Sequence, residues 1–161
     1  MKVICSVLIF FLLILTSAFS QVDIPFFDKM IGEWEGSYEV SGSKNTEKIH
    51  VEWILKHSFL EIDITGQEVD NPDLKYYQKY VFTLDNKDNL VGWGLSDNGY
   101  NDMITFKGKY DDKSISVDGT NPNYIWNVIY SFKDGKLKRK SEFKKKNSDK
   151  GSTVEVLYSK K

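Results

Sequence analysis

The sequence predicts an all-β domain: a closed antiparallel β-barrel of about ten strands with a short N-terminal helix. Short segments in which apolar and polar residues alternate follow one another along the chain, and turn residues separate them. Aromatic residues make up 14% of the chain and prolines number only three, so little interrupts strand pairing. Many half-apolar strands must face one another across a core, and closure of the sheet also removes its exposed edges.

The expected strands share this alternating pattern and cover residues 33–40, 46–56, 58–65, 75–84, 90–95, 103–110, 114–118, 124–132, 136–143 and 152–158. A polar linker, residues 67–73, precedes the fourth of them. Asp134-Gly135 separates two segments and suits a type I′ hairpin, which needs positive φ at both central residues. The one helix that we expect covers residues 25–31 and begins at a proline.

Residues 1–20 have the pattern of a secretory signal peptide. Lys2 precedes the apolar run 3–15, and the small residues Ala18 and Ser20 stand before the expected cleavage site. The alternative is a membrane anchor, but the run is shorter than the roughly 20 apolar residues that span a bilayer. We therefore expect an exported protein, periplasmic or secreted, whose barrel domain comprises residues 21–161 and has no integral membrane segment.

Charge and cysteine content exclude several classes of function. The 22 lysine and arginine residues nearly balance the 23 aspartate and glutamate residues, which favours neither nucleic acid nor an anionic membrane as a global partner. The single cysteine, Cys5, lies in the predicted leader, so the mature chain would have no disulfide, thiol nucleophile or thiolate metal site. Motifs for phosphate, dinucleotide or catalytic-zinc binding are absent. We expect neither cofactor nor metal, and the sequence does not indicate an oligomeric state.

Strand parity assigns one face of each segment to the interior. The same reasoning turns a set of aromatic residues inward, where they would line a lumen that binds a small hydrophobic or amphipathic ligand: Tyr38, Trp53, Tyr76, Tyr80, Trp93, Trp126 and Tyr130. A barrel of about ten strands is wider than the eight-stranded barrels that side chains just fill. A cavity is therefore one interpretation, and a core filled by these rings is the other.

The chain opens its first strand with Met30-Ile31-Gly32-Glu33-Trp34-Glu35-Gly36, and further motifs follow in order: Val51-Glu52-Trp53, Phe59-Leu60, Leu84-Asp85, Val91-Gly92-Trp93 and Phe106-Lys107-Gly108-Lys109-Tyr110-Asp111. This succession resembles an uncharacterised lipocalin-like bacterial family, a domain of unknown function whose members carry L-x-G-x-W-x-G and F-x-G-x-Y-D motifs. The chain departs from it at Lys56-His57, where members tend to have Gly-Gly. The resemblance implies a calycin-type barrel and leaves the function open, because the family has no established activity.

The resemblance also implies a structural plug made by Gly32, Trp34 and Arg139. Gly32 would permit a tight turn from helix to strand, and Trp34 would close one end of the barrel. Lipocalins often pack an arginine from a late strand over this tryptophan, which implies that Arg139, the only arginine, lies over Trp34. Parity alone turns Arg139 inward, where it would instead bind a ligand carboxylate, and a shifted register would leave it outside.

Histidine and carboxylate positions bear on two further functions. Nitrobindin, a related barrel family, binds haem through a histidine near its C-terminus, but no histidine follows His57 here. Glu61 and Asp63 share a face that parity turns to solvent, where paired carboxylates do no acid–base chemistry.

A structural or protein-interaction barrel with a filled core is the alternative to ligand binding, followed by a barrel isomerase or hydrolase with acid–base groups in the lumen.

Overall fold

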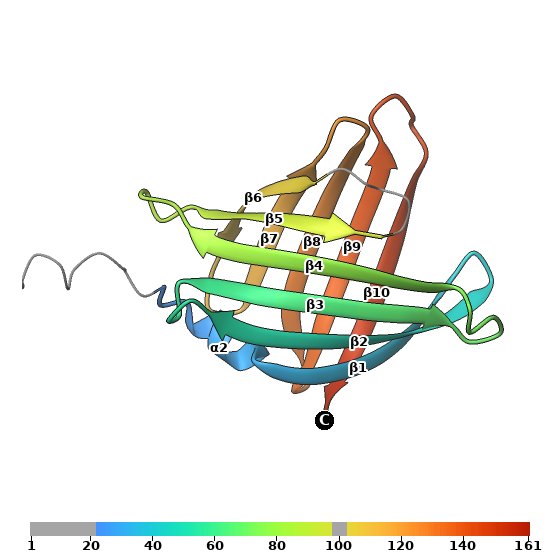
Figure 1. The fold of residues 1–161 in the computed structure, drawn as a ribbon, viewed down its shortest axis with the longest axis horizontal. Helices are drawn as coiled ribbons and strands as arrows, with labels where there is room; N and C mark the ends of the chain where they lie inside the picture. Colours follow the sequence, from blue (N-terminus) through green and yellow to red (C-terminus); the bar gives the residue numbers. More distant parts are fainter. Residues whose placement is uncertain (1–21, 98–102) are drawn as a thin grey trace, which may run out of the picture.

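The computed structural model describes residues 22–97 and 103–161. Within them the chain forms a closed barrel of ten antiparallel strands, in which each strand pairs with its sequence neighbours and β1 pairs with β10 (Figure 1). The predicted fold class, a closed antiparallel barrel with one short helix, is confirmed. The predicted signal peptide, residues 1–20, lies outside the described residues. No helix in the described part of the chain is long and apolar enough to cross a membrane.

The helix α2 covers Pro25–Met30 and precedes the strands. The strands are β1 Gly32–Val40, β2 Ser43–Ile54, β3 Phe59–Glu68, β4 Lys75–Leu84, β5 Leu90–Ser96, β6 Ile104–Tyr110, β7 Ser114–Thr120, β8 Tyr124–Lys133, β9 Lys136–Lys145 and β10 Gly151–Lys160.

Two turns show how local sequence ends the strands. Asp134 and Gly135 both have positive φ, 51° and 74°, so the predicted type I′ hairpin joins β8 to β9. Between β2 and β3, three consecutive residues, Leu55, Lys56 and His57, adopt the left-handed conformation. The strand therefore stops at Ile54, and Leu55, which parity turns inward, is instead 69% exposed.

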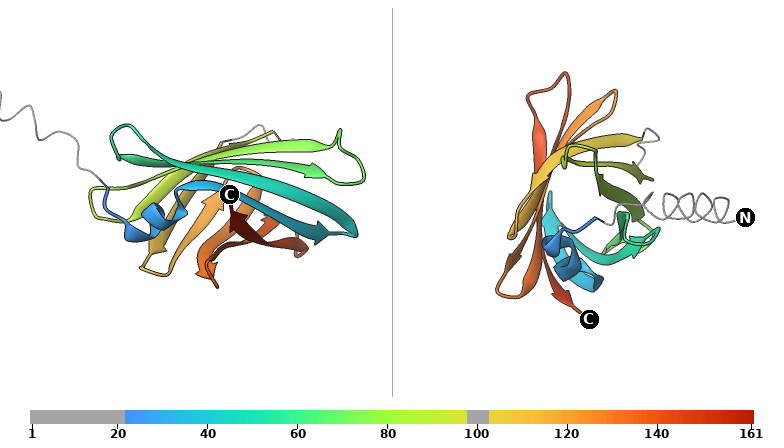
Figure 2. Two further views of the ribbon diagram at one scale, coloured as in Figure 1. Left: turned by 90° about the horizontal axis from the view of Figure 1, so that it is seen from below. Right: turned by 90° about the vertical axis from the view of Figure 1, so that its left-hand side faces the viewer.

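The two ends of the barrel differ. At the end where α2 lies (Figures 1 and 2), its buried residues Phe26, Phe27 and Met30 fill the space between the strands. Phe26 packs edge-on against Phe132, and the Phe132 ring also contacts Trp34. We call this end the closed end. The opposite end, where hairpins join β1 to β2, β3 to β4 and β9 to β10, is called the open end.

One strand carries its large residues on the face opposite to the prediction. Leu90, Gly92 and Gly94 of β5 face the interior, whereas Trp93 is 40% exposed on the outside. The reason is space: the Phe82 ring lies over Gly92 and the Tyr80 ring lies over Gly94, so a side chain at either glycine would overlap them. The predicted lumen position of Trp93 is therefore wrong.

Candidate functional site

The interior of the open half contains a cavity of about 190 Å³. Its walls come from β1, β2, β4, β8, β9 and β10, and its aromatic lining includes Tyr38, Tyr76, Tyr80 and Trp126. Two oppositely charged side chains, Glu47 of β2 and Arg139 of β9, also line it. An apolar cavity with a few convergent polar groups is the usual form of a small-molecule site.

Glu47 and Arg139 form an ion pair inside the barrel. Nη2 of Arg139 lies 2.7 Å from both carboxylate oxygens of Glu47, and the two residues are 4% and 1% exposed, respectively. Such a pair is held at the cost of desolvating both charges, so it is weak evidence of a purely stabilising role.

Two tyrosines complete the hydrogen bonding of Glu47. The Tyr76 hydroxyl donates to Oε1 and the Tyr158 hydroxyl donates to Oε2, while the Tyr38 hydroxyl lies 2.9 Å from that of Tyr76. Together with Arg139, these donors occupy the roughly four acceptor positions of a carboxylate. We refer to Glu47, Arg139, Tyr76 and Tyr158 as the lumen polar cluster.

Glycines make this cluster sterically possible. The residues paired with Glu47 on the neighbouring strands are Gly36 of β1 and Gly66 of β3. The Tyr158 ring passes over Gly36 and the Tyr76 ring passes over Gly66, so a Cβ at either position would overlap a ring. The tyrosines thus reach Glu47 across surfaces that carry no side chain.

Burial keeps the tyrosines in the form that donates. Burial, reinforced by the Glu47 charge, raises the pKa of the Tyr76 hydroxyl well above its ordinary value. Burial likewise raises the pKa of Tyr158, against the opposing effect of Arg139, and raises the pKa of Tyr80 to about 12. For Arg139, burial acts to lower the pKa, but Tyr158 and Glu47 hold it above its usual value. Near neutral pH the tyrosine hydroxyls therefore stay protonated and donate to Glu47, which pairs with the Arg139 guanidinium.

This arrangement suits binding better than acid–base catalysis. A general base needs a free lone pair within reach of the proton that it abstracts. Both Glu47 oxygens already accept hydrogen bonds from Arg139 and a tyrosine. The cluster therefore presents fixed dipoles to the cavity and no free carboxylate lone pair.

The structure brings four of the seven predicted aromatic lumen residues to the cavity and places three elsewhere. Tyr38, Tyr76, Tyr80 and Trp126 line the cavity, as does Arg139. Tyr130 is fully buried, outside the cavity lining, and its hydroxyl has no hydrogen-bond partner. Trp53 lies at the closed end, where its Nε1 donates to Asp28 and its ring contacts Phe27. Trp93 is on the outer face, where its ring contacts Phe59.

The plug at the closed end differs from the expectation in its cation. Trp34 is 2% exposed and donates from Nε1 to the Met30 carbonyl at 2.7 Å. Gly32, with φ of 124°, makes the turn from α2 into β1, as expected. The ammonium over the Trp34 ring is that of Lys160, 5.3 Å from the ring centroid. Arg139 is inward as parity predicts but pairs with Glu47, so its predicted place over Trp34 is wrong.

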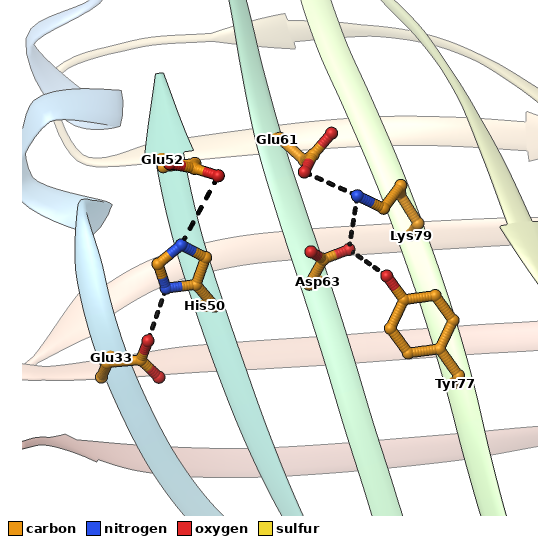
Figure 3. Close-up of polar contacts among 7 residues, drawn as sticks. All are labelled: Glu33, His50, Glu52, Glu61, Asp63, Tyr77 and Lys79. Atoms are coloured by element: carbon orange, nitrogen blue, oxygen red, sulfur yellow. Dashed lines mark hydrogen bonds and ion pairs between the residues drawn. The ribbon is translucent and has the colours of Figure 1, made fainter. Parts of the chain in front are cut away.

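The outer face of β1–β4 carries charged contacts that need no ligand (Figure 3). Lys79 lies between Glu61 and Asp63, 2.6 and 3.2 Å from their oxygens, and His50 lies between Glu33 and Glu52. The predicted outward position of Glu61 and Asp63 is confirmed. Among the described residues no group of three His, Cys, Asp or Glu side chains is placed to hold a metal ion.

Sequence reasoning missed Glu47, the centre of the cluster. Its parity is that of Ile49 and Val51, which are both buried, so alternation along β2 alone places it inside. Tyr158 is likewise inward with Val156. Residue type argued against an inward position for Glu47, because a charged residue near the start of a strand is usually solvated.

Comparison with known proteins does not identify a family for this chain. No protein-family model matches the chain, and no curated protein matches it. The barrel is consistent with a calycin-type fold, and the lipocalin-like resemblance rests on the motifs in the sequence.

Proposed function

We propose that this protein binds a small amphipathic molecule in the open half of its barrel, as expected of a lipocalin-like protein. The observation that carries the proposal is the cavity of about 190 Å³, which aromatic rings and a buried ion pair line together. Rings supply apolar contact, and a few fixed polar groups orient the ligand, which is the usual division of labour in such sites.

The size of the cavity limits the ligand. An apolar cavity of about 150 Å³ holds benzene. A cavity of about 190 Å³ therefore suits a molecule, or the buried part of one, of roughly six to ten non-hydrogen atoms.

Export belongs to the proposal. The leader-like pattern of residues 1–20 supports it, and a periplasmic or secreted binding protein would meet its ligand outside the cytoplasm. The N-terminal sequence of the protein recovered from its own host tests this: cleavage after Ser20 is expected, and an intact Met1 on all of the protein would contradict it.

Native mass spectrometry of the mature chain purified from its own host tests ligand binding. We expect a retained small molecule, and its mass would identify the compound class. A bare chain whose melting temperature also stays unchanged by a panel of lipophilic compounds of this size would contradict the proposal and favour a barrel with a filled core.

Matched variants locate the site. Val154→Phe places a ring in the cavity lining, whereas Val81→Phe adds the same ring on the outer face beside Trp93. Loss of the ligand is expected in Val154→Phe alone. Equal loss in both, or in neither, would move the ligand away from this cavity.

A further inference from the structure

The polarity of the cavity narrows the chemistry of its ligand, if the proposed binding function holds. Glu47 and Arg139 are the only charged side chains among the described residues that line the cavity. They neutralise each other through the 2.7 Å contacts of Nη2 with both carboxylate oxygens. The cavity therefore presents strong local dipoles but no net charge.

Among the charged and amide groups of the cavity lining, the hydrogen-bonding capacity that remains is that of N–H donors. The oxygens of Glu47 already accept from Arg139, Tyr76 and Tyr158. Arg139, a residue with five N–H donors, directs only Nη2 at Glu47. Its Nε is fully buried, so the N–H groups of Nη1 are the donors that remain for a molecule in the cavity. A guanidinium that is nine-tenths buried and lines a cavity with uncommitted N–H groups is a site for an acceptor.

A second polar contact points the same way. The Tyr80 hydroxyl donates to the side-chain oxygen of Gln78 at 2.8 Å, which occupies that oxygen and leaves the Gln78 amide nitrogen as a donor at the cavity wall. An incoming molecule thus meets amide and guanidinium N–H groups, whereas the carboxylate and amide oxygens are engaged.

We infer that the ligand is an electrically neutral molecule with an aromatic or alicyclic body and a hydrogen-bond acceptor, such as a carbonyl or ether oxygen, that the free N–H groups of Arg139 bind. A carboxylate ligand would enter a lumen whose cation is already neutralised and would lie beside the Glu47 charge. A cationic ligand would lie beside Arg139, and the carboxylate that lines the cavity, Glu47, already accepts from Arg139 and two tyrosines. Each ion would lose its hydration without a matching partner, which is costly in a buried site.

Four molecules of the same shape test this inference. Acetophenone carries a neutral acceptor, α-methylstyrene is its apolar isostere, benzoate is its anionic isostere and benzamidinium its cationic one. Binding to the mature chain is measured by NMR titration at pH 7. We expect acetophenone to bind about fivefold more tightly than α-methylstyrene, the effect of one net hydrogen bond, and at least about tenfold more tightly than either ion.

The pattern of outcomes separates the inference from the function on which it rests. Equal affinity for the two neutral molecules, or tightest binding of either ion, overturns the inference but leaves a binding barrel. No binding by any of the four, together with a bare chain from the host, overturns the binding function and the inference with it.

A charge variant provides an independent test. Glu47→Gln leaves the Arg139 charge without its partner, so we expect the order to reverse, with benzoate binding at least about tenfold more tightly than acetophenone. The control is Glu61→Gln, which removes the same charge from the outer face, where Glu61 pairs with Lys79. It should leave the order of the four affinities unchanged. An unchanged order in a folded Glu47→Gln protein overturns the inference. If that variant does not fold, the ranking of the four molecules on the unaltered chain decides alone.

Discussion

The closed and open halves of the barrel are built from the same strands but use aromatic residues in opposite ways. At the closed end the Phe132 ring contacts both Phe26 and Trp34, and rings fill the interior. At the open end the rings of Tyr38 and Tyr76 lie beside a cavity; their hydroxyls pair with each other, and that of Tyr76 donates to Glu47. The closed half removes apolar surface from water, whereas the open half positions polar side chains around a cavity.

This difference indicates how stability and function are divided in the fold. The closed half contributes apolar burial, which is the main favourable term in folding. The open half keeps a desolvated ion pair that a well-packed apolar core would not need. Substitutions in the two halves should therefore separate stability from binding.

The largest expected effect comes from the ion pair. Arg139→Met removes the cation and leaves the Glu47 charge buried, so the free energy of unfolding should fall by about 3–5 kcal/mol. Denaturant unfolding followed by near-UV circular dichroism measures it. Adding Glu47→Leu to Arg139→Met should restore part of the loss, because no uncompensated charge remains. A loss below about 1 kcal/mol in the single variant would show that Glu47 is not desolvated as the structure has it.

Truncation at the closed end should cost slightly less and leave binding intact. Phe26→Ala deletes a fully buried ring that contacts Phe132. We expect a loss of about 3 kcal/mol, at the low end for such a change, because a short helix at the rim of a barrel can collapse onto the gap. Calorimetry and ligand titration on the same sample measure both quantities. A loss of ligand affinity in this variant would mean that the two halves are coupled.

Alkaline pH should destabilise the barrel through its buried tyrosines. The pKa of Tyr80 is raised to about 12 by burial, and burial also raises the pKa of Tyr130 and Tyr158. Above about pH 10 the tyrosines of the unfolded chain ionise while these do not, so each one removes about 1.4 kcal/mol of stability per pH unit. Their contribution is fully present below pH 10 and is lost as pH rises toward the folded-state pKa.

Melting temperatures between pH 8 and pH 11.5 measure this loss. Tyr80→Phe should make the decline shallower, because one titrating hydroxyl is gone. A melting temperature that stays constant up to pH 11.5 would contradict the burial of these hydroxyls.

A smaller change tests how the polar cluster is positioned. Gly66→Ala places a methyl group in the space that the Tyr76 ring occupies, so the ring must move and its hydroxyl leaves Glu47. We expect a loss of about 1–2 kcal/mol in unfolding free energy from the overpacking. Gly135→Ala, in the β8–β9 hairpin, is the control without overlap: it has open space around it, so any loss of stability there comes from its positive φ of 74°. Weaker binding in Gly66→Ala alone would tie the cluster to the ligand.

The predictable part of the fold is that governed by local alternation. Ile62 and Ile64 oppose Glu61 and Asp63, and the structure confirms this division between inside and outside. Turn chemistry was equally readable at Asp134-Gly135, because positive φ at both positions is a local property.

The site required information that no single strand contains. Glu47 lies between Gly36 and Gly66 only once the register of β1, β2 and β3 is known, and those glycines are what admit the two tyrosines. In the sequence, the inner face of β5 lacks large apolar residues, because Gly92 and Gly94 have no side chains. Rings from β4 fill that face, so the apolar Trp93 was assigned to the wrong side. Cavity size likewise depends on how all the inward side chains pack.

The smallest expected effect distinguishes the outer face from both halves of the interior. Trp93 is 40% exposed and its main ring contact is Phe59, so Trp93→Phe keeps an aromatic pair and should change stability by no more than about 0.5 kcal/mol. Acrylamide quenching of tryptophan fluorescence measures its exposure directly: the readily quenched fraction should fall in Trp93→Phe, whereas Trp34→Phe should remove a poorly quenched emitter, because Trp34 is buried under Lys160. A drop of several kcal/mol in Trp93→Phe, or unchanged quenching, would place this tryptophan inside the barrel. The inner face of β5 would then no longer be the glycine surface on which Tyr80 and Phe82 lie, and the shape assigned to the interior would have to change with it.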